Sequence, residues 1–213
     1  MSSPGWPAVL TDGDVILRPY RRFDGRAWSE IRRFTEEWLA KWEPTPPGPW
    51  YDLNSPGAYR FVLREMRRTA AEGSAMPFAV ALRTGSGDRL VGQLSLGSIV
   101  RRAFCSCYAG YWIDSRVAGH GVIPTALALA IDHAFQAGGL HRVEVNIRPE
   151  NTPSRRVVEK LGLREESYHS RYLHIDGAWR DHIGYAVTAE EVAAEGGLLA
   201  RWHRVRGGAE RSA

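Results

Sequence analysis

The stretch Arg116-Val117-Ala118-Gly119-His120-Gly121 decides the fold of this 213-residue chain. An apolar, aromatic run (108–113) precedes it, and a long helical pattern (122–135) follows it. A strand, a glycine-bearing turn and a helix start in this order make an anion cradle, because backbone N–H groups and the positive end of the helix dipole converge at the turn. We therefore interpret the turn as a pyrophosphate site, with a coenzyme thioester as its ligand.

The segments after the turn predict a parallel crossover. Apolar residues repeat every fourth position from Ile123 to Phe135, Gly138-Gly139 ends this pattern, and residues 142–147 alternate as a strand. A strand, a helix and a second strand connected in this way are right-handed and parallel. A further helix is expected between Asn151 and Gly162.

The remaining segments complete one sheet with its covering helices. Further strands are predicted over 14–19, 77–82, 90–100, 166–175 and 179–187, and further helices over 23–34, over 36–42 and from Pro56 onward. The last two strands meet at Asp176-Gly177, a strong hairpin signal. Gly196-Gly197 interrupts residues 189–206, so the sequence leaves open whether that segment is one helix.

Together these elements predict an α+β fold in one domain, residues 1–213. The core covers about 14–190 and a flexible tail about 207–213. The central sheet is mixed and mostly antiparallel, with about seven strands flanked by helices. A hydrophobic content of 44% is enough for one sizeable core in a chain of this length.

The composition limits the classes of partner. The net charge of +4 is mildly basic, and the excess is too small to select a nucleic acid or any other anionic partner. No run approaches the ~18 apolar residues of a membrane span, and no signal peptide is visible. We expect a cytoplasmic protein without a membrane or a direct nucleic-acid partner.

Two groups of reactive or charged residues are interpreted as structural. Arg60, Arg64, Arg67 and Arg68 lie off the apolar stripe of the helix that starts at Pro56, which favours a solvated face. Cys105 and Cys107 lack a second Cys or His pair at zinc-finger spacing, so we expect reduced, packed thiols and no metal site.

With these elements in place, the chain resembles the GNAT superfamily of N-acetyltransferases. Residues 116–121 match its Arg/Gln-x-x-Gly-x-Gly/Ala signature, and the order of elements matches over nearly the whole chain. Three further segments resemble the ribosomal-protein-alanine N-acetyltransferases of the RimJ/RimL type. These are Asn151-x-x-Ser154 with Leu161-Gly162, the hairpin 176–182, and residues 38–44.

The resemblance implies acetyl-CoA as co-substrate and a sheet that splays between its fourth and fifth strands. The exposed edge of the fourth strand would pair with pantetheine, and the backbone amides of 117–122 would take the pyrophosphate. An N–H at this edge would stabilise the oxyanion of the reaction, at ~3–4 kcal/mol per donor. The residues implied to bind the coenzyme are Trp112, Ile113, Arg116, Val117, Ala118, Gly119, His120, Gly121, Val122 and Asn151.

The resemblance also implies a catalytic serine. Many members carry a tyrosine acid seven residues after the equivalent of Asn151, where this chain has Val158. Ser154 is the residue implied to donate a hydrogen bond to the leaving sulfur. A serine in the first turn of a helix is also typical of simple capping, and Asn151 is open to a role in the local turn.

The general base is not identified by the sequence. Tyr108 and Ala109 stand on the strand where many relatives keep a glutamate. An ordered water chain is one alternative, and histidine titrates in the right pH range. The candidate side chains are Glu144, Glu166, His169, His174, Asp181 and His182.

We expect the acceptor to be a primary amine, in particular the N-terminal α-amine of a protein, with a ribosomal protein implied by the resemblance alone. An α-amine has a pKa of ~7.7–8.0 and is partly neutral near neutral pH, whereas lysine has a pKa of ~10.4. The alternatives are an acetyltransferase for a small amine, such as an antibiotic or polyamine, and a non-catalytic acyl-CoA-binding regulator. The acceptor is expected between residues 38–50 and 164–178.

The sequence leaves the oligomeric state open. Leu198, Leu199 and Trp202 fit either a core or a homodimer surface.

Overall fold

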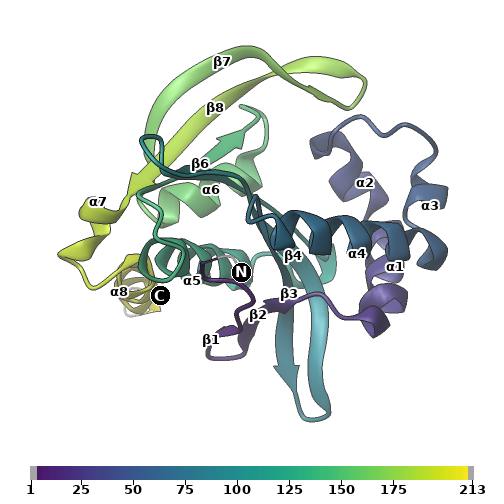
Figure 1. The fold of residues 1–213 in the computed structure, drawn as a ribbon, viewed down its shortest axis with the longest axis horizontal. Helices are drawn as coiled ribbons and strands as arrows, with labels where there is room; N and C mark the ends of the chain where they lie inside the picture. The colour runs from purple at the N-terminus through teal and green to yellow at the C-terminus, as the bar shows by residue number, and fades with distance from the viewer. Residues whose placement is uncertain (1–3, 211–213) are drawn as a thin grey trace.

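One open sheet of eight strands forms the centre of the computed structural model, which describes residues 4–210 (Figure 1). The strand order is β1-β2-β3-β4-β5-β6-β8-β7. Only the β5–β6 pair is parallel within the described part of the chain. The bounds are β1 Leu10–Asp12, β2 Val15–Pro19, β3 Met76–Thr84, β4 Gly87–Val100, β5 Ser106–Ile113, β6 Arg142–Ile147, β7 Arg164–Ile175 and β8 Ala178–Thr188.

The predicted mixed, mostly antiparallel sheet is confirmed, with one strand more than expected. The additional strand is the short β1, which pairs with β2 across a turn at Gly13. A strand of only three residues is too short to show the alternating pattern by which a strand is recognised from the sequence.

Helices cover both faces of the sheet. Helix α5 (Val122–Gln136), α6 (Thr152–Lys160) and α8 (Leu198–Glu210) pack with the larger core cluster on one face. On the other face, α1 (Gly25–Phe34) and α4 (Pro56–Ala71) form a smaller cluster around Trp28, Tyr59 and Trp112. The short helices are α2 (Glu36–Leu39), α3 (Trp50–Leu53) and α7 (Ala189–Ala193). No helix within residues 4–210 is long and apolar enough to cross a membrane.

Strands β5 and β6 separate after three paired residues. The parallel pairing runs from Ser106↔Arg142 to Tyr108↔Glu144 and then stops, while β5 continues to pair with β4 as far as Ile113. The predicted splay between the fourth and fifth strands is therefore confirmed. Beyond Tyr108, the β5 edge that faces β6 has no partner strand. Buried backbone polar groups rarely stay unpaired, so this edge is suited to bind a ligand.

The C-terminal segment forms two helices. Gly196 and Gly197 have φ values of +80° and +110°, and they break the chain between α7 and α8. The carboxylate of Asp132 on α5 then accepts hydrogen bonds from the N–H groups of Leu198 (2.7 Å) and Leu199 (2.9 Å) and so caps α8. Leu198 and Trp202 are buried in the core of this chain.

Helix α8 reaches into the segment that was expected to be a tail. It runs through Glu210, so four residues of the expected tail, 207–210, are helical here. Residues 211–213 lie outside the described residues.

A proline-rich loop, residues 43–49, is hydrogen-bonded to the tip of the β7–β8 hairpin. The N–H of Thr45 donates to the carbonyl of His174 (3.0 Å), and the N–H of Gly177 donates to the hydroxyl of Thr45 (2.8 Å). Pro44 and Ile175 also form an isolated β-bridge. In Figure 1 the hairpin arches away from the sheet towards the α2 region. Loop and hairpin thus form one bridge at the side of the β5–β6 gap.

Candidate active site

Two cavities meet at the gap between β5 and β6. The first, of about 620 Å³, lies between the 116–121 turn, α6 and the α2 region, and we call it the turn-side cavity. The second, of about 520 Å³, lies on the α1–α4 side of the sheet, and we call it the acceptor-side cavity. Both are lined by Trp42, Glu43, Tyr111, Trp112, Asn151 and Ser154. The six shared residues surround the place where two ligands entering from opposite sides would touch.

The glycine turn presents free backbone donors to the turn-side cavity. Gly119 and Gly121 have φ values of +86° and +78°, in the left-handed region that favours glycine. No hydrogen bond within residues 4–210 uses the N–H groups of 119–123. The N–H groups of Val117 and Ala118 donate to the carbonyls of Asp114 (3.0 Å) and Ser115 (3.4 Å). Of the expected donors 117–122, the N–H groups of 119–122 are therefore free within the described chain, and that of Ile123 is free as well.

Arg116 braces the turn. Its guanidinium contacts the buried Asp114 carboxylate, with Nη2 at 2.7 Å from Oδ2, and lies 4.5 Å from the ring centre of Phe34.

Arg116, Val117 and His120 do not line the turn-side cavity. The remaining residues predicted for coenzyme binding do line it: Trp112, Ile113, Ala118, Gly119, Gly121, Val122 and Asn151.

Two cations that the sequence analysis missed line the same cavity. Arg156 and Lys160 stand one turn apart on the exposed side of α6. Neither forms an ion pair with a described carboxylate. Their i, i+4 spacing was the available signal, because it puts both on one face of a helix that starts beside the turn.

The capping role at α6 belongs to Asn151. Its Oδ1 accepts a hydrogen bond from the N–H of Ser154 (3.2 Å). The Ser154 hydroxyl is therefore not the cap of its own helix. The phenol of Tyr111, a residue not singled out from the sequence, donates to the Ser154 carbonyl at 3.3 Å. Burial raises the pKa of Tyr111 above its usual value, and contact with the Ser154 side chain acts in the opposite direction.

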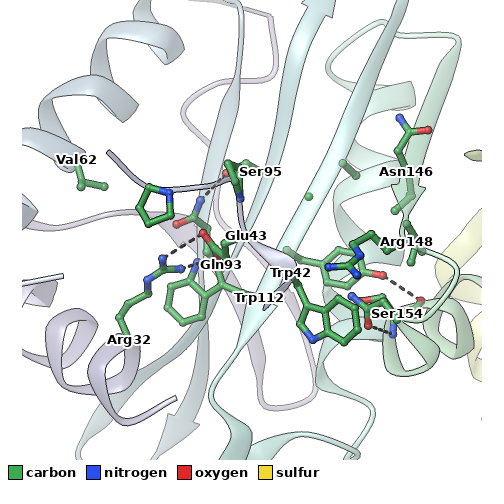
Figure 2. Close-up of a pocket in the computed structure, with 18 of the residues that line it drawn as sticks. Arg32, Trp42, Glu43, Val62, Gln93, Ser95, Trp112, Asn146, Arg148 and Ser154 are labelled. Carbon is green, nitrogen blue, oxygen red and sulfur yellow. Dashed lines mark hydrogen bonds and ion pairs between the residues drawn. The ribbon is translucent and has the colours of Figure 1, made fainter. Parts of the chain in front are cut away.

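The acceptor-side cavity is built around a neutralised ion pair and aromatic rings. Arg32 binds Glu43 (Nη1 to Oε1, 2.7 Å), and its guanidinium lies 4.5 Å from the Trp50 ring and 5.3 Å from the Trp112 ring. Figure 2 shows Trp112 and Trp42 at the centre, with the Arg32–Glu43 pair on one side and Ser154 on the other.

The walls of this cavity differ in part from those expected. The 38–50 segment contributes Trp42, Glu43, Pro44, Pro46 and Trp50. No residue of 164–178 lines the cavity; the hairpin tip reaches its edge only through the pairing of Ile175 with Pro44. Strand β6 and His182 of β8 form the opposite wall instead.

Five of the six candidate bases are occupied elsewhere or exposed. Glu144 and Glu166 both pair with Arg142, and its guanidinium holds the pKa of Glu166 at about 2. Asp181 accepts from the Tyr168 hydroxyl (2.6 Å), and this bond lowers its pKa. The other two candidates face outward or bind a neighbour: His174 is exposed, and His169 lies 2.8 Å from the hydroxyl of Ser167.

His182 alone among the six lines the acceptor-side cavity. It is 4% exposed, and its Nδ1 lies 3.0 Å from the carbonyl of Arg180. A carbonyl only accepts, so neutral His182 carries its proton on Nδ1 and leaves a lone pair on Nε2. Burial is the main cause of a lowered pKa; Arg148 and His169 lower it too, whereas the Arg180 carbonyl and Asp181 raise it.

Comparison with known proteins identifies the family. Residues 14–164 match the family model described as "Acetyltransferase (GNAT) domain". The chain is a GNAT acetyltransferase. This GNAT chain is 30% identical to the ribosomal protein uS5-alanine N-acetyltransferase of Escherichia coli (strain K12) over 183 residues, or 85% of this chain and 91% of that protein.

Two further matches support the assignment. Probable N-acetyltransferase YjcK of Bacillus subtilis (strain 168) is 39% identical over 104 residues, which span 49% of the GNAT chain and 58% of that relative. The solved structure of Mycobacterium smegmatis RimJ in complex with CoA-disulfide matches with a TM-score of 0.88 at 40% identity, covering 94% of this chain and 95% of that one. The superfamily and the RimJ/RimL-type resemblance are therefore confirmed.

The GNAT protein is an acetyl-CoA-dependent N-acetyltransferase. Its own residues fit this co-substrate. The unpaired β5 edge suits an amide-bearing arm, and the free N–H groups of 119–123, with Arg156 and Lys160 nearby, suit phosphates.

Gly119→Ala is expected to weaken coenzyme A binding about tenfold, measured by calorimetry. An alanine at φ +86° is strained by roughly 1–2 kcal/mol, and its methyl would stand where a phosphate approaches. Gly139→Ala is the matched control, because Gly139 has φ +64° and equally open space but ends the far side of α5. Equal dissociation constants for the two variants would contradict the assignment of the turn.

Proposed function

We propose that this enzyme acetylates the N-terminal α-amine of a protein, with an alanine-starting ribosomal protein as the acceptor. The observation that carries the proposal is the meeting of the two cavities at Tyr111, Trp112, Asn151 and Ser154. Acetyl-CoA entering from the turn side and an amine entering from the other side would make contact there. Relatives named for ribosomal-protein alanine acetylation supply the choice of protein.

The charges of the acceptor-side cavity disfavour a polycationic small amine. Among its described lining residues Glu43 is the single carboxylate, and Arg32 already neutralises it. The other arginine of the lining, Arg148, lies 3.4 Å from Glu150, so the described lining carries no surplus negative charge. A site for a polyamine or an aminoglycoside needs surplus negative charge. The charges of this cavity therefore favour an acceptor that presents a single, partly neutral amino group.

The contact between the proline-rich loop and the β7–β8 hairpin favours the end of a protein chain, rather than an internal residue, as the acceptor. Thr45 ties the loop to His174 and Gly177, and its neighbours Pro44 and Pro46 line the acceptor-side cavity, so these bonded segments border the approach to it. An N-terminus can enter such an approach with its end, whereas the middle of a folded chain is held outside.

In the proposed mechanism, the neutral α-amine nitrogen attacks the carbonyl carbon of the thioester. A C–N bond forms, and the oxyanion is stabilised by an N–H on the unpaired β5 edge. His182 Nε2 takes the proton that the amine loses. The C–S bond then breaks, and the thiolate leaves with a hydrogen bond from the Ser154 hydroxyl. Protonation of the thiolate completes the balance, giving the N-acetyl chain and coenzyme A.

A panel of peptides tests the acceptor. Peptides that begin with Ala, Ser or Met are compared with an N-acetylated peptide that carries an internal lysine and with a polyamine, and acetyl transfer is measured by mass spectrometry. The Ala-starting peptide is expected to lead by roughly tenfold or more in kcat/KM, since side-chain fit distinguishes substrates by about 1–3 kcal/mol. Preferred transfer to the polyamine would overturn the proposal. Tight coenzyme binding without transfer to any amine would instead favour the regulator.

His182→Gln is expected to lower kcat about 100-fold, the lower end of the range for a general base, because part of the α-amine is already neutral. The base works only when it is unprotonated, so wild-type kcat falls as the pH drops through the His182 pKa. Burial moves that pKa below its usual ~6.5. The variant should lack this acidic limb. His174→Gln, an exposed histidine on the same hairpin, should keep it; a limb that persists in His182→Gln would exclude the residue as the base.

Ser154→Ala is expected to lower kcat by roughly 10- to 100-fold while the affinity for acetyl-CoA stays unchanged. A hydrogen bond to a charged atom contributes about 1.5–3 kcal/mol, and the thiolate carries that charge only as it leaves. Asn151 retains the cap of α6 in this variant, so the helix is preserved. Ser170→Ala on the exposed side of β7 serves as the control. Wild-type turnover by Ser154→Ala would reject the role.

A further inference from the structure

Another groove lies outside the two catalytic cavities, between the start of α1 and one face of α4. It has a volume of about 690 Å³ and shares no lining residue with the turn-side or acceptor-side cavity. In Figure 1, α1 and α4 lie side by side at the end of the molecule opposite α7 and α8. Five arginines line the groove, and we call it the arginine groove: Arg22, Arg26, Arg60, Arg64 and Arg67.

The five arginines lack neutralising partners. None of them has a carboxylate within 4 Å among residues 4–210, although the chain pairs many of its other arginines. The adjacent Arg68 shows the contrast, because it binds both Glu65 and Glu72 on the same helix. The nearby Asp24 is likewise occupied, by the buried Arg18. Uncompensated like charges around one groove repel each other and attract a polyanion.

The spacing of the charges follows the groove. Arg60, Arg64 and Arg67 recur at i, i+4 and i+7 and so share one face of α4, while Arg22 and Arg26 come from the opposite wall. The α4 stripe covers about 10 Å at 1.5 Å per residue, which corresponds to roughly three stacked nucleotides at 3.4 Å each. Pro56, in the first turn of α4, also lines the groove, so the positive end of that helix dipole lies beside it.

Two exposed aromatic rings indicate which class of polyanion the arginine groove binds. Phe23, which lines the groove, is 75% exposed, and Phe61, which lies on α4 beside Arg60 and Arg64, is 53% exposed. The Arg60 guanidinium is 4.6 Å from the centre of the Phe61 ring, and that of Arg21 is 5.6 Å from the centre of the Phe23 ring. Exposed rings interleaved with arginines are stacking platforms for unpaired bases, whereas an acidic protein surface would engage only the charges.

We propose that the arginine groove binds single-stranded RNA, with the arginines on phosphates and Phe23 and Phe61 stacked on bases. The sequence alone favoured a solvated face for Arg60, Arg64 and Arg67, because it could not bring Arg22 and Arg26 against them. The site lies apart from the acetyl-transfer chemistry and does not depend on which amine is acetylated.

Fluorescence anisotropy with a short labelled oligouridine tests this proposal at salt concentrations from about 50 to about 200 mM. The wild type should bind with an affinity that falls steeply with salt. Arg60→Gln/Arg64→Gln/Arg67→Gln should reduce the slope of log K against log salt by about 2, at about 0.7 per lost phosphate contact. Phe23→Ala/Phe61→Ala should weaken binding by about 30-fold or more without changing the slope, at about 1–3 kcal/mol for each lost stacking contact. Arg68→Gln, whose arginine is paired with Glu65 and Glu72, should bind as the wild type does.

Acetyl transfer by each variant verifies that the fold is intact, because the substituted residues line neither catalytic cavity. The proposal is overturned if the oligouridine fails to bind at the lowest salt, or if the triple variant binds it as the wild type does. It is also overturned if polyglutamate competes as strongly as RNA and the phenylalanine variant is unaffected. That last result would assign the groove to an acidic protein.

Discussion

The separation of β5 from β6 is the constraint on which the rest of the structure depends. Two parallel strands that stop pairing after Tyr108↔Glu144 leave peptide groups that need hydrogen-bond partners. An amide-bearing co-substrate meets that need, and the same opening joins the cavities of the two faces. In the proposed mechanism, the gap orients the coenzyme arm, supplies the N–H donors of the reaction and sets the place where the amine arrives.

Charge is divided between the two sides of this gap. The turn side presents free N–H groups with Arg156 and Lys160, which suits phosphates. The acceptor side carries the closed Arg32–Glu43 pair among tryptophan rings and a buried histidine. Burial lowers the pKa of His182, so a positive charge on the imidazole is disfavoured until an amine delivers its proton. In the proposed function, the same scaffold binds the phosphates of the coenzyme on one side of the gap and a neutral amine on the other.

The parts that sequence reasoning predicted are those set by local pattern. The glycine turn, the helix behind it and the parallel crossover are written in contiguous residues, and the splay followed from the resemblance they support. The functional partners that it missed are brought together by the tertiary fold. Tyr111 meets Ser154 across the gap from a different element, and among the six candidate bases His182 alone lines the acceptor-side cavity, which only the fold determines. Residues 164–178 do not line the acceptor-side cavity but meet its Pro44 wall from outside, a placement that a hairpin signal in the sequence does not determine.

The glycine turn at 116–121 is supported by a helix that is synthesised much later than the turn itself. Trp202 of α8 donates to Thr125 in the first turn of α5 (2.9 Å), and its ring would lie 3.4 Å from a Cβ on Gly121. Helix α8 is the last described element of the chain, and it is capped by Asp132 of α5. During synthesis the turn is therefore made long before its support leaves the ribosome. A nascent chain therefore acquires the supported form of the turn only after residues 198–210 have been made.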